Sequence, residues 1–144
     1  MSESGQLAKL YRQIKMMIGV GRVTGSNDAG SVQTIQYQTP LEVRGDTPRL
    51  AEFGFSSGLP AGSDVVIGFL GGDRSSAVII GSNHQSFRHV GLNSGETVIY
   101  SQWGQFIKLT ESGVIIEAHN QPVTVNNATE VTVNASVKVR LNTP

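Results

Sequence analysis

The chain has 144 residues, and its 11 Lys and Arg balance its 11 Asp and Glu, so the formal net charge is zero. Binding along a nucleic-acid duplex requires an excess of cations, and this balance argues against a general nucleic-acid binder. The absence of cysteine excludes disulfides, thiolate zinc sites, iron–sulfur clusters and a cysteine nucleophile.

Seventeen glycines favour many tight turns and an all-β class. No window approaches the roughly 20 apolar residues that cross a bilayer, and the N-terminus lacks the order of segments seen in a signal peptide. We therefore expect a soluble, unprocessed product that is made in the cytoplasm.

The first segment, Glu3 to Ile18, predicts one amphipathic helix, because apolar residues recur at spacings of three and four. Ser4 is the expected N-cap and Gly19 the expected terminator. The basic residues between the apolar ones fit a partner-binding or membrane-surface helix, but three cations on a helix more often form an ordinary solvated face. The apolar positions are Leu7, Leu10, Tyr11, Ile14, Met17 and Ile18, and the cations are Lys9, Arg12 and Lys15.

Short β-rich runs follow, separated by turn residues such as those at 26–30. The run Val65 to Leu70 is so continuously apolar that it should be buried on both faces or should close a barrel. The loop 71–76 then makes a hairpin with the next run. Four or five such strands predict a small Greek-key barrel of the oligonucleotide/oligosaccharide-binding (OB) type over residues 19–90. The runs are Gly19–Thr24, Ser31–Val43, Asp64–Leu70 and Ala77–Gly81.

The segment Arg44 to Ser63 reads as a long irregular loop, and loops of that length are usually functional or part of an interface. Phe53 and Phe55 within it could stack on bases. The loop carries few cations, however, so these rings are better explained as anchors on the barrel or on a neighbouring subunit. An oligonucleotide- or glycan-binding barrel with a β-rich tail remains the alternative function.

Residues 91–144 predict three brief strands followed by an internal repeat. The strands are expected at 96–101, 105–110 and 113–118. Val123-Thr-Val-Asn126, Val131-Thr-Val-Asn134 and Val139-Arg-Leu-Asn142 then align at a constant offset of eight residues.

This repeat predicts that several copies of the chain assemble. Apolar and polar residues alternate within each unit, and three strips from one chain cannot cover their own apolar faces. Copies wound about a threefold axis, with the valines inward, are the simplest closed arrangement. The Asn that ends each unit tolerates a left-handed turn. The predicted trimer axis and shaft core consists of Val123, Val125, Val131, Val133, Val137, Val139 and Leu141.

The sequence contains no pattern typical of a catalytic site, a metal site or a cofactor site, and we expect no enzyme. Patterns for a serine nucleophile or a phosphate-binding loop are absent. His84, His89 and His119 are spread along the chain without metal-ligand spacing. A hydrolase would need two carboxylates in one cleft, and nothing in the sequence brings two together. The acidic candidates are Asp64, Asp73, Glu96, Glu111 and Glu117.

Several motifs resemble the Mu-type phage baseplate spike proteins, also called baseplate assembly protein V-like, which are relatives of type VI secretion spikes. The most specific is Phe69-Leu-Gly-Gly-Asp-Arg-Ser75, followed by Ala77-Val-Ile-Ile80. Similar segments cover nearly the whole chain. They are Ile18-Gly-Val-Gly-Arg-Val23, Phe53-Gly-Phe55, Leu59-Pro60-Ala-Gly62-Ser-Asp64-Val65-Val66, Gly91-Leu92, Gly95-Glu96 and Tyr100 to Leu109.

The resemblance implies an N-terminal helix (1–18), a barrel (19–90), and a neck with an intertwined triple-stranded β-helix (91–144) in a homotrimer. It implies a structural component of the virion, the central spike of a contractile tail baseplate. The barrel end would attach to the tail hub protein, and the shaft would pierce the host outer membrane when the sheath contracts. No specific nucleic-acid partner is expected.

One departure concerns the tip. Longer family members end in a His-x-His motif whose three copies hold iron, and the chain has no such motif before Leu141-Asn-Thr-Pro144. Either a separate protein caps the C-terminal end or the chain is a shortened version. We expect a capping partner, because an uncapped shaft would expose strand edges.

Overall fold

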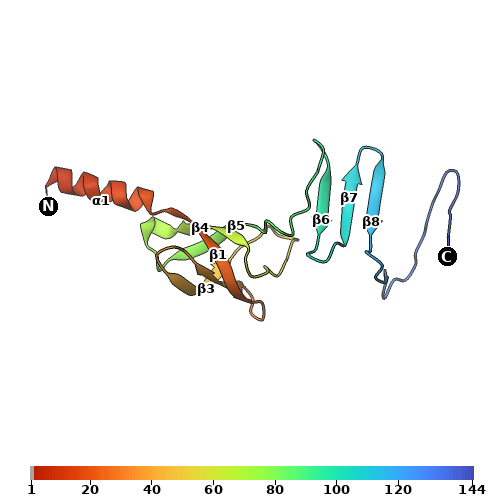
Figure 1. Cartoon of the computed structure of the whole chain (residues 1–144), viewed down its shortest axis with the longest axis horizontal. Helices are drawn as coiled ribbons and strands as arrows, with labels where there is room; N and C mark the ends of the chain where they lie inside the picture. The colour runs from red at the N-terminus through yellow and green to blue at the C-terminus, as the bar shows by residue number, and fades with distance from the viewer. Residues whose placement is uncertain (1) are drawn as a thin grey trace. The chain divides into compact units, whose positions relative to one another are not determined.

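A computed structural model describes residues 2–144, and the chain divides into two compact units, residues 1–90 and 91–144. The first unit contains one helix and a closed barrel, and the second contains a three-stranded sheet followed by an extended segment (Figure 1). The predicted mostly-β class with one N-terminal helix is confirmed. Within residues 2–144, no helix has both the length and the apolar character needed to cross a membrane.

The barrel has five strands in the order β1-β2-β3-β5-β4, and β4 pairs with β1 to close it. All neighbours are antiparallel except β3 and β5, which are parallel and meet at Arg49 and Ile79. A closed five-stranded arrangement of this kind is typical of the OB fold, so the predicted OB-like barrel is confirmed. The strands are β1 (Ile18–Asn27), β2 (Gln33–Gln38), β3 (Val43–Arg49), β4 (Asp64–Phe69) and β5 (Ala77–Asn83).

The barrel core consists of side chains that alternate along the strands. In β4, Val65, Ile67 and Phe69 are buried, whereas Val66 is 38% exposed and Leu70, beyond the strand, is 66% exposed. The expectation that this run is buried on both faces is therefore wrong, and its alternative, that the run closes a barrel, is correct. The complete buried cluster is Val23, Ile35, Tyr37, Val65, Ile67, Phe69 and Ile79.

Strand β3 lies where an irregular loop was expected. The predicted run 31–43 is interrupted at residues 39–42, where the Thr39 N–H donates to the Glu42 carbonyl, and the chain reverses into β3. Val43 to Arg49 then pairs along β2, with a register shift between Ile35 and Tyr37. Only residues 50–63 of the expected loop are free of strand structure.

Helix α1 spans Glu3–Lys15 and is shorter than predicted at its C-terminal end. Its N-cap is Ser2 rather than Ser4, because the Ser2 hydroxyl accepts the Gly5 N–H at 3.2 Å. The chain leaves the helix after Lys15, and the Met17 carbonyl accepts the Phe69 N–H at 2.7 Å. Gly19 therefore lies inside β1 and does not terminate the helix.

The second unit contains an antiparallel sheet in the order β6-β7-β8, and its strands lie where the sequence predicts them. They are β6 (Thr97–Tyr100), β7 (Phe106–Thr110) and β8 (Gly113–Glu117). Residues 118–144 of the single chain contain turns and bends but no helix or strand. The left-handed turn predicted for the repeat asparagines is wrong in detail, because Asn127 (φ 56°) adopts it and Asn126, Asn134 and Asn142 do not.

Candidate functional site

One face of the β6–β8 sheet carries large apolar side chains that nothing in the chain buries. Ile99 pairs with Ile107, and Ile107 pairs with Ile116, so these three side chains form a row across the sheet. Directly paired residues point to the same side of an antiparallel sheet, and residues two apart along a strand do so as well. Between 44% and 66% of each residue is exposed. We call this surface the apolar sheet face, and its members are Ile99, Ile107, Leu109, Val114 and Ile116.

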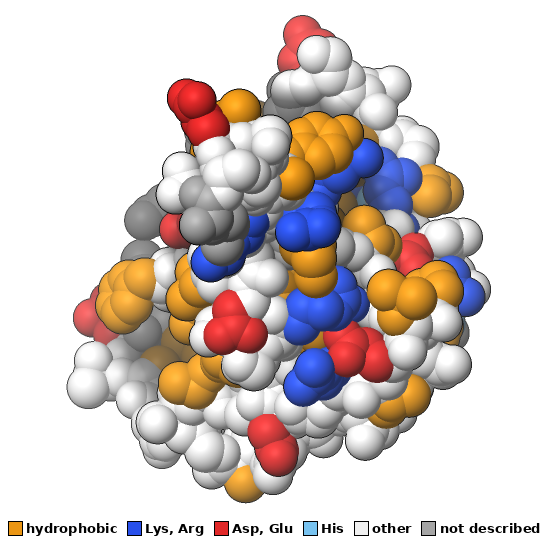
Figure 2. Space-filling model, turned by 90° about the vertical axis from the view of Figure 1, so that its left-hand side faces the viewer, with side chains coloured by type: hydrophobic (Ala, Val, Ile, Leu, Met, Phe, Trp, Pro, Cys, Tyr) orange, Lys and Arg blue, Asp and Glu red, His pale blue; other side chains and the backbone are white. Residues whose placement is uncertain are grey.

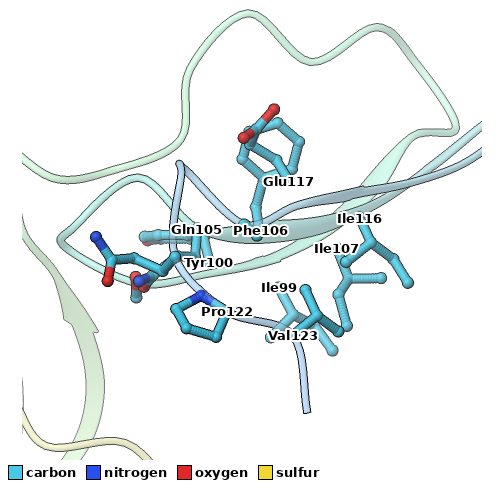
Figure 3. Close-up of a pocket in the computed structure, with 12 residues that line it drawn as sticks. Ile99, Tyr100, Gln105, Phe106, Ile107, Ile116, Glu117, Pro122 and Val123 are labelled. Carbon is cyan, nitrogen blue, oxygen red and sulfur yellow. The ribbon is translucent and has the colours of Figure 1, made fainter. Parts of the chain in front are cut away.

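The segment after β8 runs along this face and leaves an open groove of about 410 Å³. Pro122 and Val123 form its other wall. In Figure 3, the side chains of Ile99, Ile107, Ile116 and Val123 gather on one side of the sheet, and Glu117 points away from them. The structure thus brings the first predicted shaft residue, Val123, onto the apolar sheet face.

The opposite face of the same sheet is more polar and better covered. Lys108 and Glu96 approach to 3.8 Å, and the Glu96 side chain is only 12% exposed. Glu96 Oε1 also accepts the Asn93 N–H at 2.7 Å. The two faces therefore differ. Charged side chains occur along the strands of the opposite face, whereas Thr97, the partner of Leu109, is the polar residue of the β6–β7 pairs on the apolar sheet face.

The other predicted shaft residues are not gathered by the single chain. All seven predicted positions are between 59% and 92% exposed. Fully burying a Val or Leu side chain is worth about 1.5–3 kcal/mol, so this array is a large unused source of stability. Contiguous exposed apolar surfaces usually mark a protein or membrane contact.

The candidate acids do not form a hydrolase pair in the barrel. Asp64 at the start of β4 lies 3.1 Å from Arg22 and accepts the Gln85 amide at 2.8 Å, and these bonds, Gln85 first, hold its pKa below the ordinary value. Asp73 follows the far end of β4 and accepts the hydroxyl and N–H of Ser75, which lower its pKa. Both carboxylates are engaged in local structure.

In the second unit, Glu96 and Glu111 line one shallow pocket, and Glu117 lines the groove beside the apolar sheet face. Glu96 is already held by Lys108 and Asn93, as described above. Glu117 accepts the His119 N–H at 2.7 Å. The Glu96 and Glu117 carboxylates thus stabilise turns and strand ends.

The three histidines also lie apart. His84 stacks on Phe87 with ring centroids 4.2 Å apart, and its Nε2 lies 3.1 Å from the Ala61 carbonyl oxygen. His119 has a left-handed backbone (φ 53°) at the end of the β8 segment. Among residues 2–144, no group of three His, Asp or Glu side chains is arranged to hold a metal ion.

The loop after β3 displays both of its phenylalanines to solvent. Phe53 is fully exposed and Phe55 is 65% exposed, so they do not anchor the loop on the barrel as one of the expectations held. Arg49 anchors it instead, by donating to the carbonyl and hydroxyl oxygens of Ser57 at 2.6 and 2.9 Å, and to Gln33. No local sequence pattern indicates this role, because Arg49 and Gln33 are 16 positions apart in the chain.

An ionic cluster joins two turns of the barrel. Glu42, between β2 and β3, lies 2.7 Å from Arg74 and 2.8 Å from Arg44. The bond from Arg74, followed by that from Arg44, lowers the pKa of the Glu42 carboxyl. The Arg74 guanidinium also lies 4.7 Å from the centre of the Phe69 ring. Arg74 is therefore more than a turn residue, and it ties the β4–β5 connection to the β2–β3 turn.

Residues 21–86, which contain most of the barrel, match the family described as "Bacteriophage Mu Gp45, N-terminal". The chain is 32% identical over 111 residues to the Mu-like prophage FluMu protein gp45 of Haemophilus influenzae. This alignment covers 76% of the present chain and 60% of the Haemophilus protein. It is 29% identical over 109 residues to the baseplate puncturing device gp45 of Escherichia phage Mu, and this alignment covers 74% of the present chain and 55% of the phage Mu protein. The aligned part thus spans somewhat more than half of each relative, and the resemblance to Mu-type baseplate spike proteins is confirmed.

Proposed function

We propose that the chain is the central spike of a contractile phage tail baseplate, and that three copies combine their second units into an intertwined β-helical shaft. The observation that carries this proposal is the exposed apolar sheet face, together with the seven exposed apolar residues of the segment after it, of which Val123 lines the same groove. The name of the phage Mu relative, a baseplate puncturing device, supports the same role.

Both the exposed apolar side chains and the unpaired strand edges of the second unit favour assembly with further copies of the chain. Strands β6 and β8 are the edges of a three-stranded sheet, and unpaired strand edges are normally covered in soluble proteins. The repeat residues have no strand partner in their own chain. Three identical copies about one axis can cover each other's apolar faces and pair each other's edges in a closed arrangement.

The function of such a trimer is mechanical. Apolar residues packed along a common axis leave no room for water, and densely packed interiors resist compression. We propose that the barrel end attaches to the tail hub protein, and that the shaft crosses the host outer membrane when the sheath contracts. The protein would then act in the virion without catalysing a reaction.

A ligand-binding barrel is the less favoured function. Binding of single-stranded nucleic acid combines stacking aromatics with a cationic groove. Phe53 and Phe55 are exposed, but Arg49 beside them is engaged with Ser57 and Gln33. No described feature of the loop favours a nucleic acid or glycan over a protein partner.

The experiment compares two aspartate substitutions within the second unit by mass in solution. Ile107→Asp places a charge at the centre of the apolar sheet face, where burial without a partner is costly. Gln102→Asp adds the same charge in the exposed turn between β6 and β7. We expect the Gln102 variant to remain a trimer and the Ile107 variant to dissociate. A trimer that tolerates Ile107→Asp would overturn the proposed use of this face.

A further inference from the structure

Helix α1 presents an apolar strip that its own chain leaves uncovered. Leu7, Leu10 and Ile14 follow the three-and-four spacing of a coiled-coil seam, and Tyr11 lies beside them. Each of these side chains is more than half exposed, and no residue of α1 is buried. We call these four residues the α1 seam.

The barrel holds α1 from a different side. The backbone of Gly72 packs against the backbone of Gln13, so closely that a Cβ at Gly72 would lie 2.7 Å from the Gln13 carbonyl oxygen. At about 100° per residue, Gln13 lies roughly a third of a turn away from the seam. The Met17–Phe69 hydrogen bond fixes the end of the segment. The attachment therefore orients α1 and leaves its seam open.

The distribution of charge on α1 favours identical copies as the partners of the seam. Lys9 and Arg12 lie on the opposite side of the helix, and Gln6 and Gln13 on its flank are uncharged. The Lys15 Nζ atom lies over the Tyr11 ring, 5.0 Å from its centre. Glu3 lies on the seam side, one turn before Leu7. Between residues 7 and 14 the seam itself carries no charged residue, so this stretch of several copies can meet without bringing like charges together. Figure 2 turns the left-hand side of Figure 1, where α1 lies, toward the viewer; Lys and Arg (blue) and hydrophobic side chains (orange) both reach the surface there.

We propose that the α1 seams of three copies pack against one another in a parallel three-helix bundle. The inference rests on the proposed trimer, because an isolated helix of 13 residues is only marginally stable in water. Tethering within a trimer raises the effective concentration of the helices to about the millimolar range. The bundle buries the apolar strips and turns Lys9 and Arg12 outward, where they form a cationic collar.

Cysteine cross-linking tests the bundle cleanly, because the natural chain has no cysteine. Leu10→Cys places a thiol in the seam, and Arg12→Cys places one on the opposite side of the same helix as a matched control. Each full-length variant is first weighed by light scattering, then oxidised with copper phenanthroline and run without reductant. We expect the Leu10 variant to form linked pairs, with about two of three chains joined, and the Arg12 variant to remain unlinked.

The outcomes separate this proposal from the proposed function. A monomeric mass for both variants would contradict the trimer itself. A trimeric mass with no cross-link at residue 10, or with equal cross-linking at residues 10 and 12, would overturn the bundle alone. The unmodified trimer is also mixed with vesicles of phosphatidylcholine and phosphatidylglycerol. Flotation with the vesicles, together with no cross-link at residue 10, would show that the seam binds a lipid surface instead.

Discussion

The Phe69 ring occupies the space that a side chain at Gly19 would need, since a Cβ there would lie 2.7 Å from Phe69 Cε2. Phe69 is 2% exposed, and the Arg74 guanidinium covers its ring. Gly19 pairs with Ile67 where β1 meets β4. The closure of the barrel therefore depends on the absence of a side chain at residue 19.

Gly19→Ala is expected to destabilise the barrel by about 1–3 kcal/mol, the usual cost of forcing extra atoms into a packed core. Chemical unfolding of the full chain measures the change. Gly45→Ala is the matched control in β3, because a Cβ there meets no atom within 4 Å. Equal stability of the two variants would mean that the Phe69 ring moves aside at little cost.

Gly72→Ala is expected to loosen α1 from the barrel. Gly71 and Gly72 both have left-handed backbones (φ 64° and 74°), so alanine at either position carries a similar conformational cost. Only at residue 72 would the new Cβ meet the Gln13 backbone. Hydrogen exchange of the α1 amides should therefore become faster in Gly72→Ala than in Gly71→Ala. Identical exchange in both variants would contradict the close packing of η1 (Leu70–Gly72) on α1.

The Glu42 cluster is expected to make the barrel sensitive to acid. The bonds from Arg74 and Arg44 lower the pKa of folded Glu42 from its ordinary value of 4.5. A lowered pKa means that the ionised carboxylate stabilises the fold above pH 4.5, and that this stabilisation is lost as the pH falls through the lowered pKa.

Glu42→Gln should therefore be less stable than the natural chain at neutral pH, and the difference should shrink on acidification. Thermal unfolding across a pH series measures it. Glu52→Gln, in the exposed loop after β3, is the control and should match the natural chain throughout. A Glu42→Gln deficit that stays constant with pH would show that the carboxylate charge is not the cause.

Val125→Asp is expected to break the trimer, because it places like charges near the shaft axis without partners. The neighbouring substitution Thr124→Asp adds the same charge at a polar position of the same repeat unit and should leave the trimer intact. Light scattering measures the mass of each variant in solution and shows whether it is a trimer. If Val125→Asp leaves the mass unchanged, the valine column does not face the axis.

The barrel was largely predictable from alternating apolar residues, but β3 was not. Val43 to Arg49 contains Gly45, a left-handed Asp46 (φ 53°) and Pro48, which locally read as loop residues. The segment is a strand because β2 pairs along it, and such long-range pairing leaves no local pattern. The early end of α1 has a similar cause, since the Met17–Phe69 bond joins residues 52 positions apart.

The apolar sheet face could not be predicted from the sequence for a different reason. Alternation in β7 indicates that Ile107 and Leu109 share a face, but apolar residues occupy both faces of β6 and β8, as at Val98 and Ile115. The register of the three strands was needed to align Ile99 with Ile107 and Ile116. The repeat, in contrast, was evident from spacing alone, and the role of its valines as a shaft core stays a prediction.

The absolute mass of the unmodified chain in solution distinguishes a trimer from a monomer. One chain has a mass of 15.3 kDa, so three copies have a mass of 45.9 kDa, and light scattering separates the two readily. We predict the trimer, because further copies of the chain would cover the exposed apolar sheet face and the repeat valines. A stable monomer of 15.3 kDa would show that the chain does not form the proposed trimer.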